Sequence, residues 1–369
     1  MANCKFFSLM GFFFFIIFII QLSEVTFSEA QKLAPAIYVF GDSLVDVGNN
    51  NYLKISLSKA NFPHNGIDFP TKKPTGRFSN GKNAADFLAE KVGLPTSPPY
   101  LSFKSKLHKN DASFADGVSF ASGGAGIFNG TDDTFRQSLP LAKQVEYYST
   151  VFEELVKQLG STEAQKRLSK SLFVIVIGSN DIFGYFENTD LHKKYTLQQY
   201  ADFMVVTLKQ RLQQLHGYGA RKFVVAGVGP IGCCPGERYK SKTEECKEDT
   251  NELSVKYNEA LKSMLEELKI ELKDINYSYF DTYSLLLNIT KNPASYGFVE
   301  VKAACCGLGN LNAEAFCVPV SKYCSNRRDH VFWDKYHPTE AASSILVDNI
   351  FDGPSQYSFP LNVKQLIAP

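Results

Sequence analysis

The chain has 369 residues, of which 44% are hydrophobic, 21% are charged and 13% are aromatic. This balance excludes an intrinsically disordered protein, because disordered chains lack the apolar side chains that build a core. The net charge is only +1, and Lys and Arg alternate with Asp and Glu along the whole chain. That distribution argues against a nucleic-acid-binding protein, for which a basic stripe is typical.

The first element is an apolar run over residues 6–20, preceded by Lys5 and followed by a polar stretch that ends at Ala30. This order predicts a signal peptide over residues 1–30, and therefore a secreted, extracellular protein. The alternative is a membrane anchor, but the run is shorter than the ~20 apolar residues that a span needs. We expect no stable membrane anchor. Because no linker rich in Pro, Gly or Ser follows, residues 31–369 are predicted to form one domain.

Four apolar runs of strand length are each followed by turn residues, and the fourth has the weakest alternation. They cover residues 36–40, 172–177, 222–228 and 275–280. Helical patterns lie between them, over residues 81–92 behind a possible Asn80 cap, 139–159, 197–216 and 248–273. This order predicts an α/β fold with a doubly wound parallel sheet, which binds ligands beyond the carboxyl ends of its strands.

The C-terminal part contains one more helical pattern, which we expect to start at Pro338 because proline suits a first helical turn. Residues 352–369 contain three prolines, and we expect them to be irregular.

Residues 41–44 (Gly-Asp-Ser-Leu) place Ser43 just beyond the first predicted strand. A serine hydroxyl becomes a nucleophile when a base removes its proton, and the reaction also needs donors for the developing oxyanion. Alone the tetrapeptide is weak evidence, because Gly-Asp-Ser is also ordinary turn chemistry.

Asp334 and His337 are three residues apart, so the carboxylate can reach one ring nitrogen and leave the other as a base. A helix-capping aspartate beside a bystander histidine is the competing interpretation. His330 follows Asp329 and is the only rival base, but adjacent side chains rarely orient each other suitably. The remaining histidines are interpreted as surface or capping residues: His64, His108, His192 and His216.

Asn180 follows the second predicted strand, which brings its side-chain amide to the same edge as Ser43. Residues 119–127 form a loop of small residues whose backbone N–H groups can approach a ligand, and Gly124 or Gly126 is expected to supply one donor. The motif G-x-S-x-G is absent, which argues against the standard α/β-hydrolase design.

Seven cysteines follow the predicted signal peptide, in one group of three (Cys233, Cys234, Cys246) and one of four (Cys305, Cys306, Cys317, Cys324). A zinc site is the alternative to disulfides, but neither group has paired C-x₂-C spacings, so we expect no metal. One of the first two cysteines is expected to bond Cys246, and the Cys305/Cys306 pair to bond the last two. Three sequons, at Asn129, Asn276 and Asn288, are candidate glycosylation sites.

These segments, in this order, resemble the blocks of the plant GDSL esterase/lipase family within the SGNH hydrolase superfamily. The resemblance rests on residues 40–50, 74–81, 303–307 and 331–339, which span nearly the whole mature chain. Relatives often have Asn where this chain has Ser119, a difference that affects the glycine loop but removes no catalytic group.

The resemblance implies a three-layer α/β/α sandwich, flavodoxin-like, with a parallel sheet of about five strands. It also implies a catalytic triad of Ser43, Asp334 and His337, with an oxyanion hole formed by Ser43, a glycine of residues 124–126, and Asn180. The expected protein is a monomeric, cofactor-free serine esterase acting on lipid or acylated carbohydrate. An acyltransferase with the same triad and a non-catalytic secreted binding or defence protein remain as alternatives.

Overall fold

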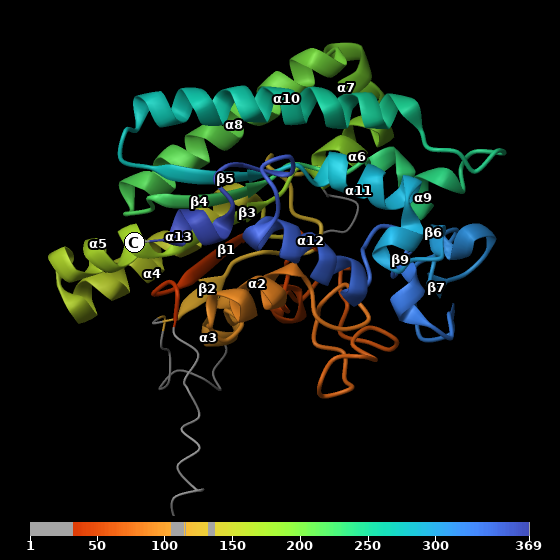
Figure 1. Ribbon diagram of the computed structural model, residues 1–369, viewed down its shortest axis with the longest axis horizontal. Helices are drawn as coiled ribbons and strands as arrows, with labels where there is room; N and C mark the ends of the chain where they lie inside the picture. Colours follow the sequence, from red (N-terminus) through yellow and green to blue (C-terminus); the bar gives the residue numbers. More distant parts are fainter. Residues whose placement is uncertain (1–31, 105–113, 115, 132–136, 369) are drawn as a thin grey trace, which may run out of the picture. The chain divides into compact units, whose positions relative to one another are not determined.

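Parallel strand pairing builds the centre of the molecule. The computed structural model describes residues 32–104, 114, 116–131 and 137–368. Its main sheet has six strands in the order β10-β5-β4-β3-β1-β2 (Figure 1). Five of them are parallel, and β10 runs antiparallel to β5. Their bounds are β1 Ile37–Gly41, β2 Gly117–Ser119, β3 Leu172–Val176, β4 Lys222–Ala226, β5 Asn276–Phe280 and β10 Ser358–Pro360.

Both faces of this sheet are apolar, which explains why its strands read as continuous apolar runs. In β1, Tyr38 and Phe40 belong to the core on one face, whereas Ile37 and Val39 belong to the core on the other. Helices complete both cores, so the fold is the expected α/β/α sandwich with five parallel strands. The antiparallel β10 is an addition to the predicted sheet.

The larger core lies between the sheet and four long helices, of which α8 and α10 pack against each other (Figure 1). These are α4 Leu141–Leu159, α5 Ser161–Lys170, α8 Leu197–Gly217 and α10 Glu248–Glu271. The helices predicted over 139–159, 197–216 and 248–273 are therefore present within two residues of their expected ends.

The second core is covered by α2, α11, α12 and α13. Their bounds are α2 Ala84–Val92, α11 Thr282–Lys291, α12 Glu340–Asp352 and α13 Val363–Ile367. Shorter helices are α3 Tyr100–Lys104, α6 Ser179–Glu187, α7 Thr189–Lys194 and α9 Pro235–Arg238. Two small sheets pair β6 Glu300–Ala304 with β9 His330–Phe332, and β7 Cys306–Gly307 with β8 Lys322–Tyr323.

Two helix starts differ from their predictions. The first begins at Ala84, because Asn83 forms a capping box with Asp86, so the expected Asn80 cap is wrong. Asn80 instead accepts a hydrogen bond from the Glu340 backbone N–H. The helix expected at Pro338 begins at Glu340, because Thr339 is its N-cap and bonds the Ala342 N–H.

The prediction of an irregular C-terminal tail is wrong. Residues 358–360 pair with β5 as strand β10, and α13 follows with a capping box between Asn362 and Gln365. Proline is tolerated in β10 because this strand lies at the edge of the sheet. Val363 and Leu366 are buried in the second core, so the tail is a packed part of the fold.

The glycine loop is shorter than the predicted loop over residues 119–127, because β2 takes its first residue, Ser119. Strand β2 was not predicted, because three residues are too few to show an alternating pattern of apolar side chains. Strand β2 pairs with β1, so the loop leaves the sheet beside the turn that carries Ser43.

The predicted signal peptide, residues 1–30, lies outside the described residues. From Leu33 onward the chain forms one compact unit. Within the described ranges, none of the helices combines the length and the apolar character that crossing a bilayer requires.

We predict that Leu366→Ala lowers the free energy of unfolding by about 2–4 kcal/mol, because it leaves a cavity in the second core. Lys364→Ala, at an exposed position of the same helix, should change it by less than about 0.5 kcal/mol. Urea unfolding of both variants measures this. Equal stability of the two would contradict a packed C-terminal helix.

Candidate active site

Ser43 lies in a tight turn at the carboxyl end of β1. The Asp42 N–H donates to the Val176 carbonyl at 3.1 Å, and the Leu44 N–H donates to Asp42 Oδ1 at 2.9 Å. A Cβ atom on Gly41 would lie 2.3 Å from the same carbonyl, so only glycine fits before the turn. The chain therefore leaves the strand in a fixed direction, with Ser43 only partly buried.

A buried glutamine from α4 holds the end of this strand. Gln144 Oε1 accepts from the Gly41 N–H and its Nε2 donates to the Gly41 carbonyl, both at 2.8 Å. The Gln144 side chain thus takes the place of a neighbouring strand at the last residue before the turn. Sequence reasoning missed this residue, because it reads as one polar position on an amphipathic helix.

His337 and Asp334 reach Ser43 from the other end of the sequence. His337 Nε2 is 2.7 Å from Ser43 Oγ, and His337 Nδ1 is 2.7 Å and 2.8 Å from the two carboxylate oxygens of Asp334. All three distances permit hydrogen bonds, so the three side chains form a continuous chain. The structure thus brings Ser43, at the turn after the first predicted strand, together with the Asp334 and His337 pair that the sequence placed in a second turn.

The carboxylate of Asp334 is held in its charged form. Burial alone would raise its pKa, but the adjacent His337 ring, with its hydrogen bond, and the backbone N–H groups of Tyr336 and His337 keep the pKa below its usual value. The two backbone bonds also fix the turn between the two side chains.

The aromatic ring of Phe78 packs on the His337 ring, with centroids 4.9 Å apart and planes tilted by 32°. This contact restricts the imidazole from the side that the carboxylate does not hold. Phe78 lies within residues 74–81, one of the segments that carry the family resemblance. Nothing in the spacing of residues along the sequence predicted that Phe78 would lie beside His337.

The other candidate donors lie beside Ser43. Asn180 is in the first turn of α6, after β3, and its amide Nδ2 donates to the Ala125 carbonyl at 2.9 Å. Gly124 has a φ of 81° and lines the same cavity as Ser43 and Asn180. Gly126 packs instead against Thr131 and Asp181, whose atoms a Cβ would meet at 2.3 Å and 2.6 Å.

Two buried carboxylates position the glycine loop by accepting backbone hydrogen bonds. Asp46 accepts from the Gly123 N–H at 3.0 Å, and Asp181 accepts from the Ile127 N–H at 2.9 Å and the Phe128 N–H at 3.2 Å. The first acid belongs to the segment after Ser43 and the second to α6. They therefore attach the loop to the segments that follow β1 and β3.

Two asparagines complete this support. Asn49 Nδ2 donates to the Ser119 and Ala121 carbonyls, and Asn50 Nδ2 donates to the Gly123 carbonyl. The Ser119 hydroxyl is buried without a hydrogen-bond partner among the described residues. Ser119 therefore contributes only its backbone to this support.

Three buried acids lie close to the site, and among the described residues no Lys or Arg forms an ion pair with their carboxylates. Burial raises the pKa of Asp42 to about 7, and it raises the pKa of Asp46 and Asp181 to about 6 despite the backbone donors. Asp42 Oδ2 has no hydrogen-bond partner among the described residues, and this carboxyl faces both His337 and Asp181. Ionisation of Asp42 is therefore unfavourable in the folded protein.

A cavity of about 600 Å³ contains the whole constellation. Ser43, Asn180, Gly124 and His337 are part of its wall. Most of the remaining lining is apolar, including Leu57, Phe62, Phe183, Leu286, Phe316 and Phe332. Such a site suits a ligand with a large apolar part and one polar group to be positioned.

The rival histidine also has a carboxylate partner. His330 Nδ1 is 2.5 Å from Asp329 Oδ1, so this histidine is one of the rare cases in which adjacent side chains pair. His330 is on β9, and it is not part of the cavity wall that contains Ser43. Its pairing therefore does not make it a partner of the serine.

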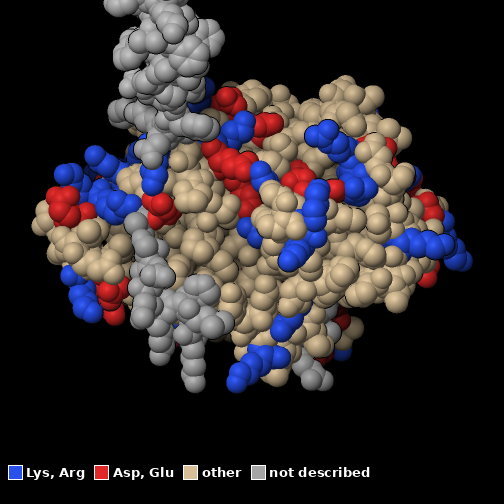
Figure 2. Space-filling view, turned by 90° about the horizontal axis from the view of Figure 1, so that it is seen from below, with Lys and Arg blue, Asp and Glu red and all other residues tan. Residues whose placement is uncertain are grey.

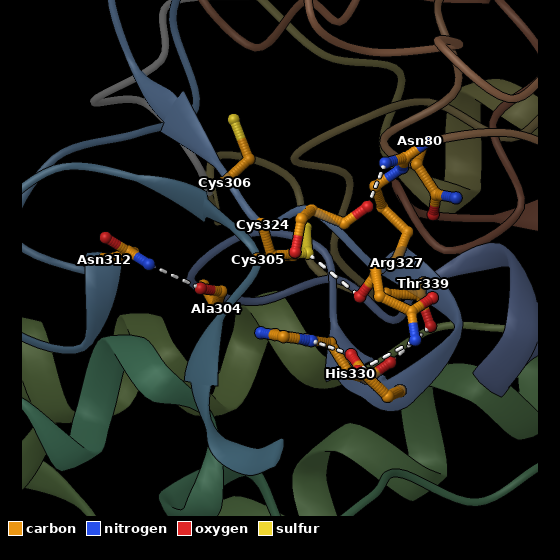
Figure 3. Close-up of a disulfide and its surroundings, with 12 residues drawn as sticks. Asn80, Ala304, Cys305, Cys306, Asn312, Cys324, Arg327, His330 and Thr339 are labelled. Carbon is orange, nitrogen blue, oxygen red and sulfur yellow. Dashed lines mark hydrogen bonds and ion pairs between the residues drawn. A yellow bond between two sulfur atoms is a disulfide. The ribbon is translucent and has the colours of Figure 1, made fainter. Parts of the chain in front are cut away.

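Three disulfides are present, Cys233–Cys246, Cys305–Cys324 and Cys306–Cys317, as the grouping predicted, and Cys234 is a free thiol. Figure 3 shows Cys305 and Cys306 beside the segment that carries Arg327, His330 and Thr339. Across the described part of the chain, no group of three or more His, Cys, Asp or Glu side chains is arranged to hold a metal ion.

The two C-terminal disulfides are connected to the histidine turn through the backbone. The Cys305 N–H donates to the Phe332 carbonyl, and the Cys306 N–H donates to the Trp333 carbonyl. Trp333 is fully buried, and its indole N–H donates to Asn65 Oδ1 at 2.9 Å. The segment that ends in Asp334 is thus fixed on both sides.

Comparison with known proteins gives a family match. The model of the GDSL-like lipase/acylhydrolase family matches residues 37–350. A GDSL esterase/lipase of Arabidopsis thaliana is 54% identical over 344 residues, which cover 91% of this chain and 91% of that protein. A second from the same plant is 37% identical over 340 residues, covering 91% of this chain and 94% of that protein.

We predict that Asp42→Asn changes the pH dependence of stability. Since the pKa of Asp42 is about 7 in the folded protein and 3.8 ordinarily, the folded state keeps a proton that the unfolded chain has released. The resulting stabilisation is present below about pH 4 and is lost as the pH rises through about 7. Relative to the parent, the variant should therefore gain up to about 4 kcal/mol between these limits.

Urea unfolding of the parent and the variant at several pH values between about 4 and 8 measures this difference. The exposed Asp190→Asn serves as the control, because its carboxylate lies largely in water. A constant stability difference between parent and Asp42→Asn across this range would show that the Asp42 carboxyl ionises normally.

Proposed function

Because the chain belongs to the GDSL-like lipase/acylhydrolase family and is a hydrolase of ester bonds, we propose that it cleaves carboxylic esters through an acyl-enzyme on Ser43. The observation that carries this proposal is the unbroken hydrogen-bond chain from Ser43 Oγ through the His337 ring to Asp334. It lies at the wall of a cavity that a substrate can occupy.

In the proposed first step, Ser43 Oγ attacks the ester carbonyl carbon while His337 Nε2 takes the hydroxyl proton. This requires the neutral ring to carry its proton on Nδ1, and this N–H donates a hydrogen bond to the Asp334 carboxylate. The same carboxylate stabilises the imidazolium that forms. His337 then returns the proton to the departing alkoxide, and a water molecule hydrolyses the acyl-enzyme by the same route.

The oxyanion is assigned to three donors: the Ser43 N–H, the Gly124 N–H and the Asn180 side-chain amide. Asn180 uses one of its two N–H bonds on the Ala125 carbonyl, and this fixes the direction of the other. Gly124 is preferred to Gly126 because it lines the cavity. Donors held in advance by other bonds lose little energy in reorienting when charge develops.

The apolar cavity wall supports an acyl chain as the part of the substrate that is bound, whether the ester belongs to a lipid or to an acylated carbohydrate. We further propose that the protein is secreted. The three disulfides support this, because such bonds persist in oxidising compartments.

Secretion would expose the sequons to glycosylation, and they differ in their surroundings. Asn129 and Asn276 are exposed and are the favoured acceptors. The Asn288 amide nitrogen donates to the hydroxyls of Tyr296 and Tyr357. A glycan on this nitrogen would replace one of these bonds, so Asn288 is the least favoured of the three.

We predict that Ser43→Ala and His337→Ala each reduce kcat by roughly 10⁴-fold or more, because they remove the nucleophile or its base. His330→Ala is the matched control and should retain activity, since its ring lies outside the cavity wall. Hydrolysis of nitrophenyl esters of increasing acyl length measures this, and the same profile reports which chains the cavity accepts. Full activity of Ser43→Ala would refute the proposed function.

We predict that Asn180→Ala lowers kcat by about 10²–10³-fold with a smaller change in KM, because it removes a donor that matters most in the transition state. The thermal unfolding midpoint of the same preparation controls for folding. Unchanged kcat would exclude this amide from the oxyanion hole.

A further inference from the structure

The mouth of the catalytic cavity contains exposed apolar side chains from two segments, residues 52–64 and 316–323, which we call the rim segments. Leu57 is 61% exposed and Phe316 is 42% exposed, although both also line the cavity. The two segments meet through the rings of His64 and Tyr323, whose centroids are 4.7 Å apart. They therefore form one continuous border beside the place where substrate enters.

Apolar exposure continues outward from the cavity along both segments. Ile55 is 59% exposed and Val320 is 80% exposed, and neither lines the cavity. A β-branched apolar side chain at the tip of a loop gains nothing from packing in the folded monomer. A contiguous group of such residues next to a ligand site usually marks a surface for binding.

The second rim segment holds its apolar tip outward by its own bonds. The Ser321 hydroxyl accepts from the Val318 N–H and donates to the Phe316 carbonyl. The Cys306–Cys317 disulfide attaches the segment to the rest of the fold. Val320 is therefore presented on a fixed turn.

The charges of the rim segments are of one sign. The segments contain Lys54, Lys59 and Lys322 and no Asp or Glu. Among the described residues, none forms an ion pair with these three lysines. The exposed acid of the cavity wall, Glu187, belongs to α6 and to neither segment. Figure 2 shows the molecule from below, where basic and acidic side chains are interspersed over the visible surface.

From these observations we propose that the rim segments dock the protein on an anionic lipid surface, with the cavity mouth facing the lipid. The exposed apolar side chains would leave water for the acyl region, and the lysines would contact the negatively charged headgroups. Docking in this orientation lets an ester enter the cavity directly from the lipid layer. This use of docking rests on the proposed function, whereas the binding itself does not.

Binding is measured with the inactive Ser43→Ala protein, by co-sedimentation with vesicles of phosphatidylcholine containing phosphatidylglycerol. Because no turnover is needed, failure of the proposed chemistry and failure of docking are separate results. The rim variant Ile55→Asp/Val320→Asp should weaken binding at least about tenfold, since it places two charges at the interface. Lys54→Gln/Lys322→Gln should weaken it about 25-fold, at about fivefold per lysine, and only on vesicles that contain phosphatidylglycerol.

The matched control is Val206→Asp/Ile270→Asp, which changes two exposed apolar residues on α8 and α10. These helices cover the sheet face opposite to α2 and α12 (Figure 1). The control should bind vesicles as the parent does, and the active form of each variant should still hydrolyse a dissolved acetate ester. Absence of vesicle binding by the parent, or equal effects of the rim and control variants, would overturn the proposal.

Discussion

The hydrogen bond between Ser43 and His337 joins positions 294 residues apart, and the rest of the structure serves to keep this distance at 2.7 Å. One partner is fixed by the sheet, since Gly41 ends β1 and Gln144 holds its backbone. The other is fixed by the Asp334 turn, which the buried Trp333 connects to Asn65. A shift of either support would break a contact that tolerates only a few tenths of an ångström.

The same principle governs the donors. The three glycines of the loop have no side chains with which to fix it, so its position comes largely from polar groups of other segments, chiefly Asp46, Asp181 and Asn49. Burial of Asp46, Asp181 and the nearby Asp42 makes the ionised form of each carboxyl unfavourable. Their pKa values are therefore raised. This energetic cost arises beside the glycine loop, whose backbone must be positioned precisely for a ligand.

Sequence reasoning found the parts of this site that depend on local order. The strand before Ser43 and the three-residue spacing of Asp334 and His337 are short-range features, and parallel strands bring their carboxyl ends to one edge by necessity. Gln144, Phe78 and Asp181 were missed as supports because each acts on a partner distant in the sequence. Nothing in composition or spacing distinguishes such residues from ordinary polar or core positions.

The same limit explains the errors in the fold. Residues 358–360 become a strand because β5 offers an open edge, and three prolines argued against regular structure when read without that partner. Asn80 is a reasonable cap by residue type, but Asn83 has Asp86 at the right distance and completes the box. A long-range partner decided the structure of residues 358–360, and a better local partner decided the cap. Residue preference alone did not distinguish the alternatives in either case.

The pairing of Cys305 with Cys324 and Cys306 with Cys317 has a consequence for the order of events during maturation. Both disulfides are connected through the backbone to the turn that carries the histidine, and Cys306–Cys317 also attaches the second rim segment. A newly made, reduced chain would lack both of these covalent anchors. Competence would then be gained by oxidation after synthesis, which would protect the cell that produces this hydrolase from its activity until the protein has left a reducing environment.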